Sequence, residues 1–320
     1  MRKTVKRGML FVLILAVILA GASVWARKRV IKYAGYIEGR NRPTAMLSAE
    51  PAETIDVLVL GDSESYTSVS TMDLWKEHGI TAFDCGQGGQ RIQETYYMLK
   101  TALQRQSPKV VVLETNVMFR NPGPFKNTQI ALAEMLRYYF PVFRYHNLWK
   151  TIFEEKAEEI SDYKGFRIRE KIIPYQGGEY MKETKETAEI SPFVEHYMKG
   201  IRRLCGESGA KLLLVSAPSP VNYNYKKHNT IQAYADRYSI PYIDLNMKTE
   251  ELGIDWEKDS MDKGDHLNVY GAEKVTGYLG RYLAEHYSLE DHRADEAYAK
   301  WNELAEKYEK ELEERTGTRR

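Results

Sequence analysis

The chain has 320 residues and a formal net charge of +1, a length that allows one large domain or at most two small ones. The near-neutral charge and the lack of a basic stripe interleaved with aromatic residues give no sign of a nucleic-acid partner. The two cysteines, Cys85 and Cys205, are too few for a disulfide scaffold, and their spacing fits no zinc pattern.

Residues 1–26 predict a basic N-terminus followed by a transmembrane anchor. Four basic residues precede an uncharged apolar run of 19 residues, Gly8 to Ala26. At about 1.5 Å per residue this run nearly crosses a hydrocarbon core of about 30 Å. A cleaved signal peptide is the alternative, because small residues stand near 20–23. The length of the run and Trp25, which precedes three basic residues, favour an uncleaved anchor.

Three further segments are distinguished by composition. Residues 27–50 are basic, then small and polar, which predicts a stalk. Residues 118–190 are rich in aromatic and then in charged residues, and we expect a helical insertion within a domain spanning 51–288. The tail, 289–320, spaces apolar residues as an amphipathic helix does.

The domain alternates short apolar runs with helical patterns. The runs are continuous rather than alternating, as is typical of parallel strands covered on both faces. Five strands are expected, at 55–60, 80–85, 109–115, 210–217 and 241–246. Helices are expected near 66–77, 90–106, 192–208, 228–238 and 269–287. This order predicts an α/β fold, a three-layer αβα arrangement around a doubly wound parallel sheet.

Polar and glycine residues follow the ends of these strands, where an open α/β sheet binds its ligands. Ser63 follows the first strand, Gly89 the second and Asn116 the third. Asp262, Asp265 and His266 precede the last helix. A serine becomes a nucleophile when an imidazole takes its proton and a carboxylate orients that imidazole. The Ser63 and Gly89 N–H groups and the Asn116 amide are candidate donors to an oxyanion.

Each feature also has a plain structural interpretation. A glycine turn after a strand, an asparagine that caps a helix and a histidine at a helix start are all common. Asp262, Asp265 and His266 offer a metal too few ligands, so we expect neither a metal nor a cofactor. The order of the features, each at a strand end or a helix start, favours an enzyme.

These residues resemble the four sequence blocks of the SGNH (GDSL-type) hydrolase superfamily. "GDSES" is similar to the first block and makes Ser63 the nucleophile, whereas "DCGQGG" places the oxyanion glycine at Gly89. "LETN" puts Asn116 on the family's asparagine. The resemblance covers about 51–288 and implies a flavodoxin-like fold. Asp84, which stands where asparagine is usual, and Glu114 depart from the family pattern.

The fourth block leaves the triad acid open. The family pattern is D-x-x-H, but in "DKGDH" Asp262 lies four residues before His266 and Asp265 lies one before it. A neighbouring side chain points away from His266 in most turn geometries, whereas a loop containing Gly264 can fold Asp262 back. We therefore favour Asp262 as the triad acid and expect Asp265 to cap the last helix.

Within the superfamily, the chain is most similar to membrane-anchored bacterial branches that modify teichoic acids and exopolysaccharides. That resemblance implies a single-pass protein with an extracytoplasmic catalytic domain. The expected activity is O-acyl transfer to a hydroxyl of an envelope polysaccharide or teichoic-acid-like acceptor, beside a membrane-bound O-acyltransferase partner. A polysaccharide or lipid deacylase and a catalytically inactive binding module are the alternatives.

Overall fold

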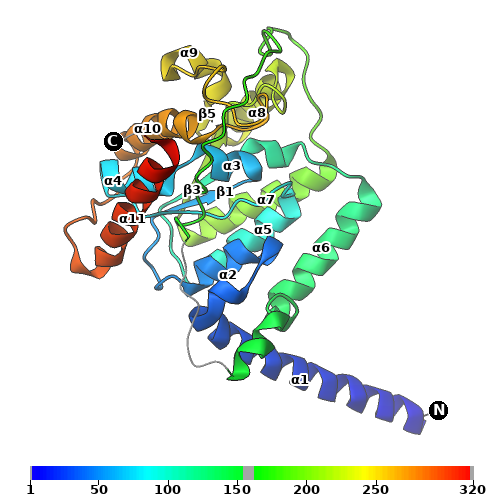
Figure 1. The fold of residues 1–320 in the computed structure, drawn as a ribbon. Helices are drawn as coiled ribbons and strands as arrows, with labels where there is room; N and C mark the ends of the chain where they lie inside the picture. Colours follow the sequence, from blue (N-terminus) through cyan, green and yellow to red (C-terminus); the bar gives the residue numbers. More distant parts are fainter. Residues whose placement is uncertain (1, 154–161, 318–320) are drawn as a thin grey trace.

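The computed structural model describes residues 2–153 and 162–317 (Figure 1). Five parallel strands form one sheet in the order β2-β1-β3-β4-β5. Their bounds are β1 (Val57–Leu60), β2 (Ala82–Asp84), β3 (Val110–Glu114), β4 (Lys211–Ser216) and β5 (Tyr242–Asp244). This order is the flavodoxin-like version of a doubly wound sheet, so the fold class expected from the sequence is confirmed.

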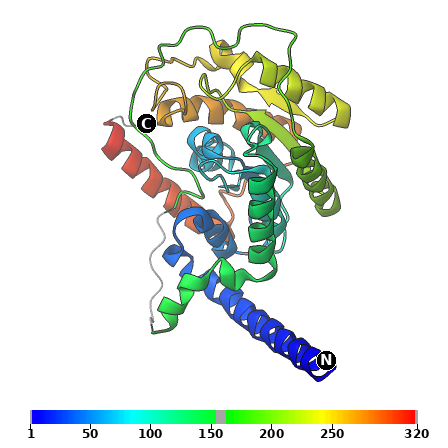
Figure 2. The same ribbon diagram turned by 90° about the vertical axis from the view of Figure 1, so that its right-hand side faces the viewer.

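Helices cover both faces of the sheet (Figures 1 and 2). One face is packed by α4 (Thr71–His78) and α10 (Val269–His286). The other is packed by the helices α5 (Ile92–Ala102), α7 (Pro192–Ser208) and α8 (Tyr225–Tyr238). Side chains of successive strand residues therefore point into two separate cores. Val57 and Val59 belong to one core, and Leu58 and Leu60 belong to the other.

Two predicted elements differ from the structure. The helix expected near 66–77 is two helices, α3 (Ser63–Ser68) and α4, because Val69 is extended and the Ser70 hydroxyl caps the second one. The insertion is only partly helical. It contains α6 (Pro124–Tyr139), η4 (Pro141–Phe143) and η5 (His146–Phe153), whereas 162–191 has no helix or regular strand. Residues 154–161 of the insertion and 318–320 of the tail lie outside the described part of the chain.

Residues 27–50 do not form the expected stalk. The first helix, α1 (Arg2–Tyr33), continues through the basic segment, and α2 (Arg42–Ala49) follows two 3-10 turns, Ala34–Tyr36 and Gly39–Asn41. Their apolar side chains are buried in the same core as α5 and α7. The prediction followed the basic residues and missed an apolar stripe that is buried against the domain. This stripe consists of Ala26, Val30, Tyr33, Ala34, Ile37, Ala45, Met46 and Leu47.

The tail forms a docked helix, as its pattern predicted. In α11 (Ala299–Thr316) the side chains of Trp301, Tyr308 and Leu312 are buried, and Trp301 packs on Trp75 of α4 with ring centroids 5.3 Å apart. At the other end of the chain, α1 projects away from the domain in both views (Figures 1 and 2). Lys3–Tyr36 is the one segment of the described residues that is long and apolar enough to cross a membrane.

Candidate active site

Ser63 is the first residue of α3, immediately beyond the carboxyl end of β1. The fully buried Asp62 caps this helix, and its Oδ1 accepts the Glu64 N–H at 3.0 Å. Capping by Asp62 turns the chain out of the sheet and leaves Ser63 partly exposed at the sheet edge. The helix begins at Ser63, three residues before the predicted start near 66.

Asp262 and His266 form a close pair. The Nδ1 atom of His266 lies 2.6 Å from Asp262 Oδ2, and the His266 backbone N–H donates to Asp262 Oδ1 at 2.7 Å. Two consecutive residues with positive φ, Lys263 at 67° and Gly264 at 87°, fold the loop so that both contacts form. The imidazole is thereby fixed, with Nδ1 toward the carboxylate and Nε2 on the opposite side of the ring.

Asp265 has a different partner. Its Oδ2 lies 3.7 Å from His266 Nδ1, and its Oδ1 accepts a hydrogen bond from the Asn222 amide. The expectation that Asp265 caps the last helix is wrong. Asn268 is the cap of α10, because its Oδ1 accepts the N–H groups of Tyr270 and Gly271 at 3.1 and 3.2 Å.

The Nε2 atom of His266 is buried and has no hydrogen-bond partner among the described residues. The hydrogen bond between Ser63 and His266 that a serine triad uses is therefore not formed in this structure. Such bonds are often long without a substrate and tighten when one binds. A nitrogen of His266 lies within 4.8 Å of a carboxylate oxygen of Glu64, the residue that follows Ser63 in α3.

Asn116 is the second residue beyond β3, and both polar atoms of its side chain form hydrogen bonds. Its Nδ2 donates to Asp62 Oδ2 at 3.0 Å, and its Oδ1 accepts from Lys227 Nζ at 3.2 Å. Asp62 Oδ2 also pairs with Arg120. One of the two amide hydrogens of Asn116 remains for an oxyanion. Gly89, with φ of 62°, lines the same pocket as Asn116, Arg120 and Lys227, which has a volume of about 420 Å³.

A second pocket, of about 400 Å³, lies beside His266. It is lined by the predicted acid and base together with residues of α3, of the 162–191 segment and of α11: Tyr66, Thr67, Arg169, Glu170, Lys171, Met261, Asp262, His266 and Arg315. The 162–191 segment is held over the site by main-chain bonds. The Ile173 N–H donates to the Ser260 carbonyl at 2.8 Å, and the Val269 N–H donates to the Arg169 carbonyl at 2.7 Å.

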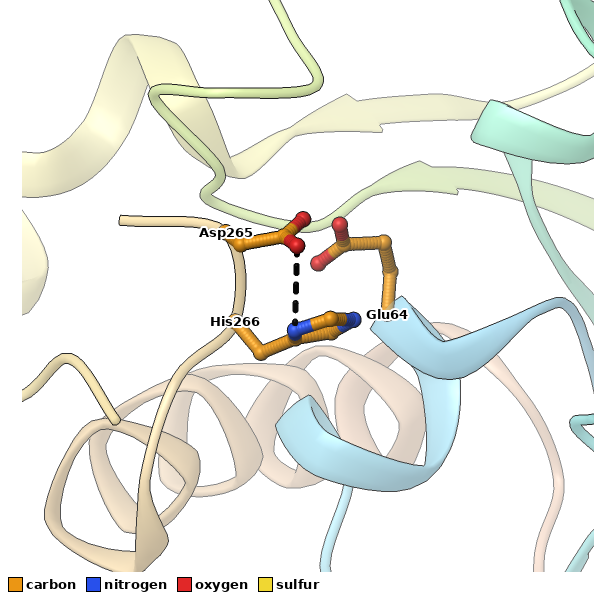
Figure 3. Close-up of side chains that lie close together, drawn as sticks. All are labelled: Glu64, Asp265 and His266. Atoms are coloured by element: carbon orange, nitrogen blue, oxygen red, sulfur yellow. Dashed lines mark ion pairs between the residues drawn. The ribbon is translucent and has the colours of Figure 1, made fainter. Parts of the chain in front are cut away.

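Glu64, Asp265 and His266 lie around a common point (Figure 3). One ligand-type atom from each of the three lies within 4.8 Å of the other two. Glu64 Oε1 accepts from Asn222 Nδ2 at 2.5 Å, whereas Glu64 Oε2 is buried and has no partner among the described residues. The His266 atom that faces Asp265 is Nδ1, at 3.7 Å from Oδ2, and this atom already lies 2.6 Å from Asp262 Oδ2. A metal ion bound to Nδ1 would therefore compete with Asp262 for the imidazole.

Buried carboxyl groups surround the serine. Burial, together with the neighbouring Asp62, raises the pKa of Glu64 and of Glu114 well above the usual range. Burial lowers the pKa of Lys227.

Asp84 is the last residue of β2 and stands where the second sequence block described above usually has asparagine. Its Oδ1 accepts the Gly86 N–H at 2.6 Å and the Ser65 hydroxyl at 3.0 Å, and its Oδ2 is buried without a partner among the described residues. Burial raises the pKa of Asp84 to about 7. A side chain on Gly86 would lie 2.1 Å from Ser65 Oγ, so this approach requires glycine.

Substituting Asp84→Asn should stabilise the protein at neutral pH. The folded state disfavours ionised Asp84, so the wild type loses stability as pH rises from about 4 to about 7. The amide never ionises. The unfolding free energies should therefore match near pH 4, and the variant should gain up to about 4 kcal/mol above pH 7. Thermal unfolding at pH 4.5 and pH 8 measures this, and a difference that does not grow with pH would contradict the burial of a neutral Asp84.

Four site residues were not among the predicted ones: Glu64, Arg120, Asn222 and Lys227. Glu64 stands next to Ser63 in the sequence, but an acid in the first turn of a helix is ordinarily solvated. Arg120 lies four residues after Asn116, which is the one spacing that could have indicated it. Asn222 and Lys227 follow β4 and reach the site only through the fold.

No protein-family model matches this chain, and no curated protein is similar enough to be counted as a relative. Solved structures that the chain resembles include a GDSL-like lipase from Bacteroides thetaiotaomicron, with 13% identity over 79% of this chain and 98% of the other, and a TM-score of 0.40. A lipase/acylhydrolase from Enterococcus faecalis has 12% identity over 74% and 99% of the two chains, with a TM-score of 0.38. The chain is thus structurally similar to GDSL-like lipases and acylhydrolases.

Proposed function

We propose that the protein is a membrane-anchored serine esterase or O-acyltransferase that acts outside the cytoplasm on a hydroxyl of a cell-envelope polysaccharide. The observation that carries this proposal is the Asp262–His266 pair at 2.6 Å, whose Nε2 has no hydrogen-bond partner among the described residues, together with the partly exposed Ser63 at the start of α3. A fixed imidazole with one unoccupied nitrogen is the base that a serine nucleophile requires.

The proposed reaction passes through a covalent intermediate. Ser63 Oγ attacks an acyl carbonyl while His266 Nε2 takes its proton, and Asp262 stabilises the resulting imidazolium. The oxyanion is bound by the Ser63 and Gly89 N–H groups and the remaining Asn116 amide hydrogen. The protonated His266 then gives its proton to the leaving group. The acyl group passes from Ser63 to water or to an acceptor hydroxyl.

The surroundings of His266 support a large anionic acceptor. Arg169, Lys171 and Arg315 line the pocket beside it together with the acidic Glu170 and Asp262. Among the described residues, Arg315 pairs with Glu170 at 3.4 Å and Glu311 at 2.7 Å, whereas Arg169 and Lys171 have no carboxylate partner. A phosphate-bearing envelope polymer, such as a teichoic-acid-like chain, suits this lining. The apolar helix α1 supports retention at the membrane, because Ser23, near the end of its uncharged run, is buried against the domain. A membrane-bound O-acyltransferase is the proposed donor partner.

A binding module without turnover is a second candidate. It is favoured by the Asn116 amide already bound to Asp62 and by the missing contact between Ser63 and His266. In such a module the same pocket would hold the polymer, while Ser63 would stay unreactive.

A serine-reactive fluorophosphonate probe distinguishes the two candidates. We expect it to label the folded protein, and Ser63→Ala to abolish labelling, whereas Ser208→Ala, at the exposed end of α7, should leave labelling unchanged. A folded protein that the probe does not label would favour the binding module.

The direction of acyl transfer is tested in cells. In a strain carrying Ser63→Ala, ester-linked acyl groups on the isolated envelope polymer should fall, because transfer onto the polymer stops. A rise in ester content would instead identify a deacylase.

A further inference from the structure

A pocket of about 480 Å³ lies where α1 meets the domain, apart from the candidate active site. Five of the side chains that line it are cationic: Arg27, Lys28, Arg105, Arg137 and Arg144. The carboxylate paired with this group is Glu134, whose two oxygens bind Arg137 at 2.5 Å and Arg144 at 2.7 Å. Among the described residues, no acidic side chain pairs with the other three cations, so the pocket has an excess of four positive charges.

The position of the pocket on α1 places it at a membrane surface. The uncharged run ends at Ala26, and the next two residues, Arg27 and Lys28, line the pocket. All 19 residues of that run are needed to cross about 30 Å of hydrocarbon. Yet Ser23 and Ala26, near its end, are 3% and 0% exposed because the domain packs on them. The part of the domain around this turn of α1 therefore lies at the depth of the lipid headgroups.

The surface beside α1 has the side chains expected at that depth. The segment packed on α1 comprises η4 and η5, and Arg29 Nε bonds Thr151 Oγ1 of η5 at 2.9 Å (Figures 1 and 2). On this segment Phe143, Trp149 and Ile152 are 45%, 57% and 54% exposed. Exposed aromatic and apolar side chains next to a spanning helix are typical of a protein surface immersed in the interface of a bilayer.

We propose that this basic pocket binds the phosphate headgroup of an anionic phospholipid from the leaflet that α1 enters. The proposal rests on the anchoring part of the proposed function but not on its chemistry. Guanidinium groups match phosphate oxygens in pairs, and each cation near an anionic membrane surface adds to the attraction. Val30, Ile31, Pro141, Tyr138 and Tyr145 supply an apolar lining that suits a glycerol backbone and the first acyl carbons, which free phosphate lacks.

Binding is tested by isothermal titration of the full-length protein in a non-ionic detergent. The probes are dihexanoyl-phosphatidylglycerol, dihexanoyl-phosphatidylcholine and inorganic phosphate. We expect the anionic lipid to bind at least tenfold more tightly than either of the others. The double variant Arg27→Gln/Lys28→Gln should weaken its binding at least tenfold, and so should Arg105→Gln, which alters no residue of α1. The control Lys126→Gln/Lys150→Gln removes two exposed cations outside the pocket and should change binding less than twofold.

Three results would overturn the proposal: unchanged binding in both pocket variants, equal binding of the zwitterionic lipid, or equal binding of inorganic phosphate. Fluorophosphonate labelling of Ser63 in the same samples keeps the two proposals separate. If a pocket variant loses lipid binding while its Ser63 is still fully labelled, the variant is folded and the loss of binding is due to the pocket. Lipid binding without labelling of the unmodified protein refutes the proposed chemistry alone.

Discussion

Replacing His266 by glutamine should lower kcat/KM for a small acetyl ester by about 10³-fold or more, with little change in KM. Glutamine nearly preserves the size of the side chain but has no nitrogen that takes a proton. Ser63 would then keep its proton and remain a weak nucleophile. Hydrolysis of p-nitrophenyl acetate and the rate of fluorophosphonate labelling both measure this loss.

The matched control is His286→Gln, on the exposed last turn of α10, which should retain full activity. Dialysis against a chelator adds an independent control. A serine site keeps its activity without divalent ions, whereas a metal held by Glu64, Asp265 and His266 would be removed. A folded His266→Gln protein with full esterase activity would eliminate the triad, and loss of activity on chelation would favour the metal centre.

The sheet could be predicted from the sequence because each strand is a short apolar run bounded by polar residues. The five runs lie where they were expected, and each strand begins one or two residues later and ends at most two residues earlier than predicted. The strand order could not be predicted in the same way. Strands such as β1 and β3 are apolar on both faces, so their patterns do not say which strand lies beside which. The order follows from packing and from the right-handed crossovers.

The segment between the apolar run and the domain shows why charge can mislead. Arg27, Lys28 and Arg29 suggested a solvated stalk, but they belong to faces of α1 that flank a buried stripe. Long cationic side chains cover apolar surface while their heads reach water or a polar partner, as Arg29 does with Thr151. Periodicity of Ala26, Val30 and Tyr33 was the usable signal in this segment.

The sequence could predict those residues of the candidate site that follow the end of a strand. Ser63, Gly89 and Asn116 each follow a different strand, and parallel strands bring their carboxyl ends to one edge. Arg120 and Lys227 are single charged residues of a kind that usually faces solvent, and only the spacing of Arg120 from Asn116 offered a local signal. Their role in balancing Asp62 and Glu114 depends on burial, which only the folded chain shows.

Asp262→Asn should lower kcat by about 10³–10⁴-fold, whereas Asp265→Asn should lower it less than tenfold. The triad acid accepts a hydrogen bond from Nδ1–H, which holds the proton on Nδ1 and leaves Nε2 free to take the proton of Ser63. An asparagine at 262 would present its amide hydrogens to Nδ1, which lies 2.6 Å from Asp262 Oδ2, and would favour the tautomer with the proton on Nε2. The corresponding change in serine proteases costs about 10⁴-fold while the geometry is kept.

The two variants share a loop, so each is the control of the other. Asp265 lies farther from Nδ1, at 3.7 Å, and its other oxygen is held by Asn222. The unfolding midpoint should change little in either variant, because Asp262 Oδ1 can still accept the His266 N–H and because Asn268, not Asp265, caps α10. A large loss of kcat in Asp265→Asn alone would assign the orienting carboxylate to Asp265. Comparable losses in both would mean that the imidazole is shared by the two acids, since Nδ1 faces both of them.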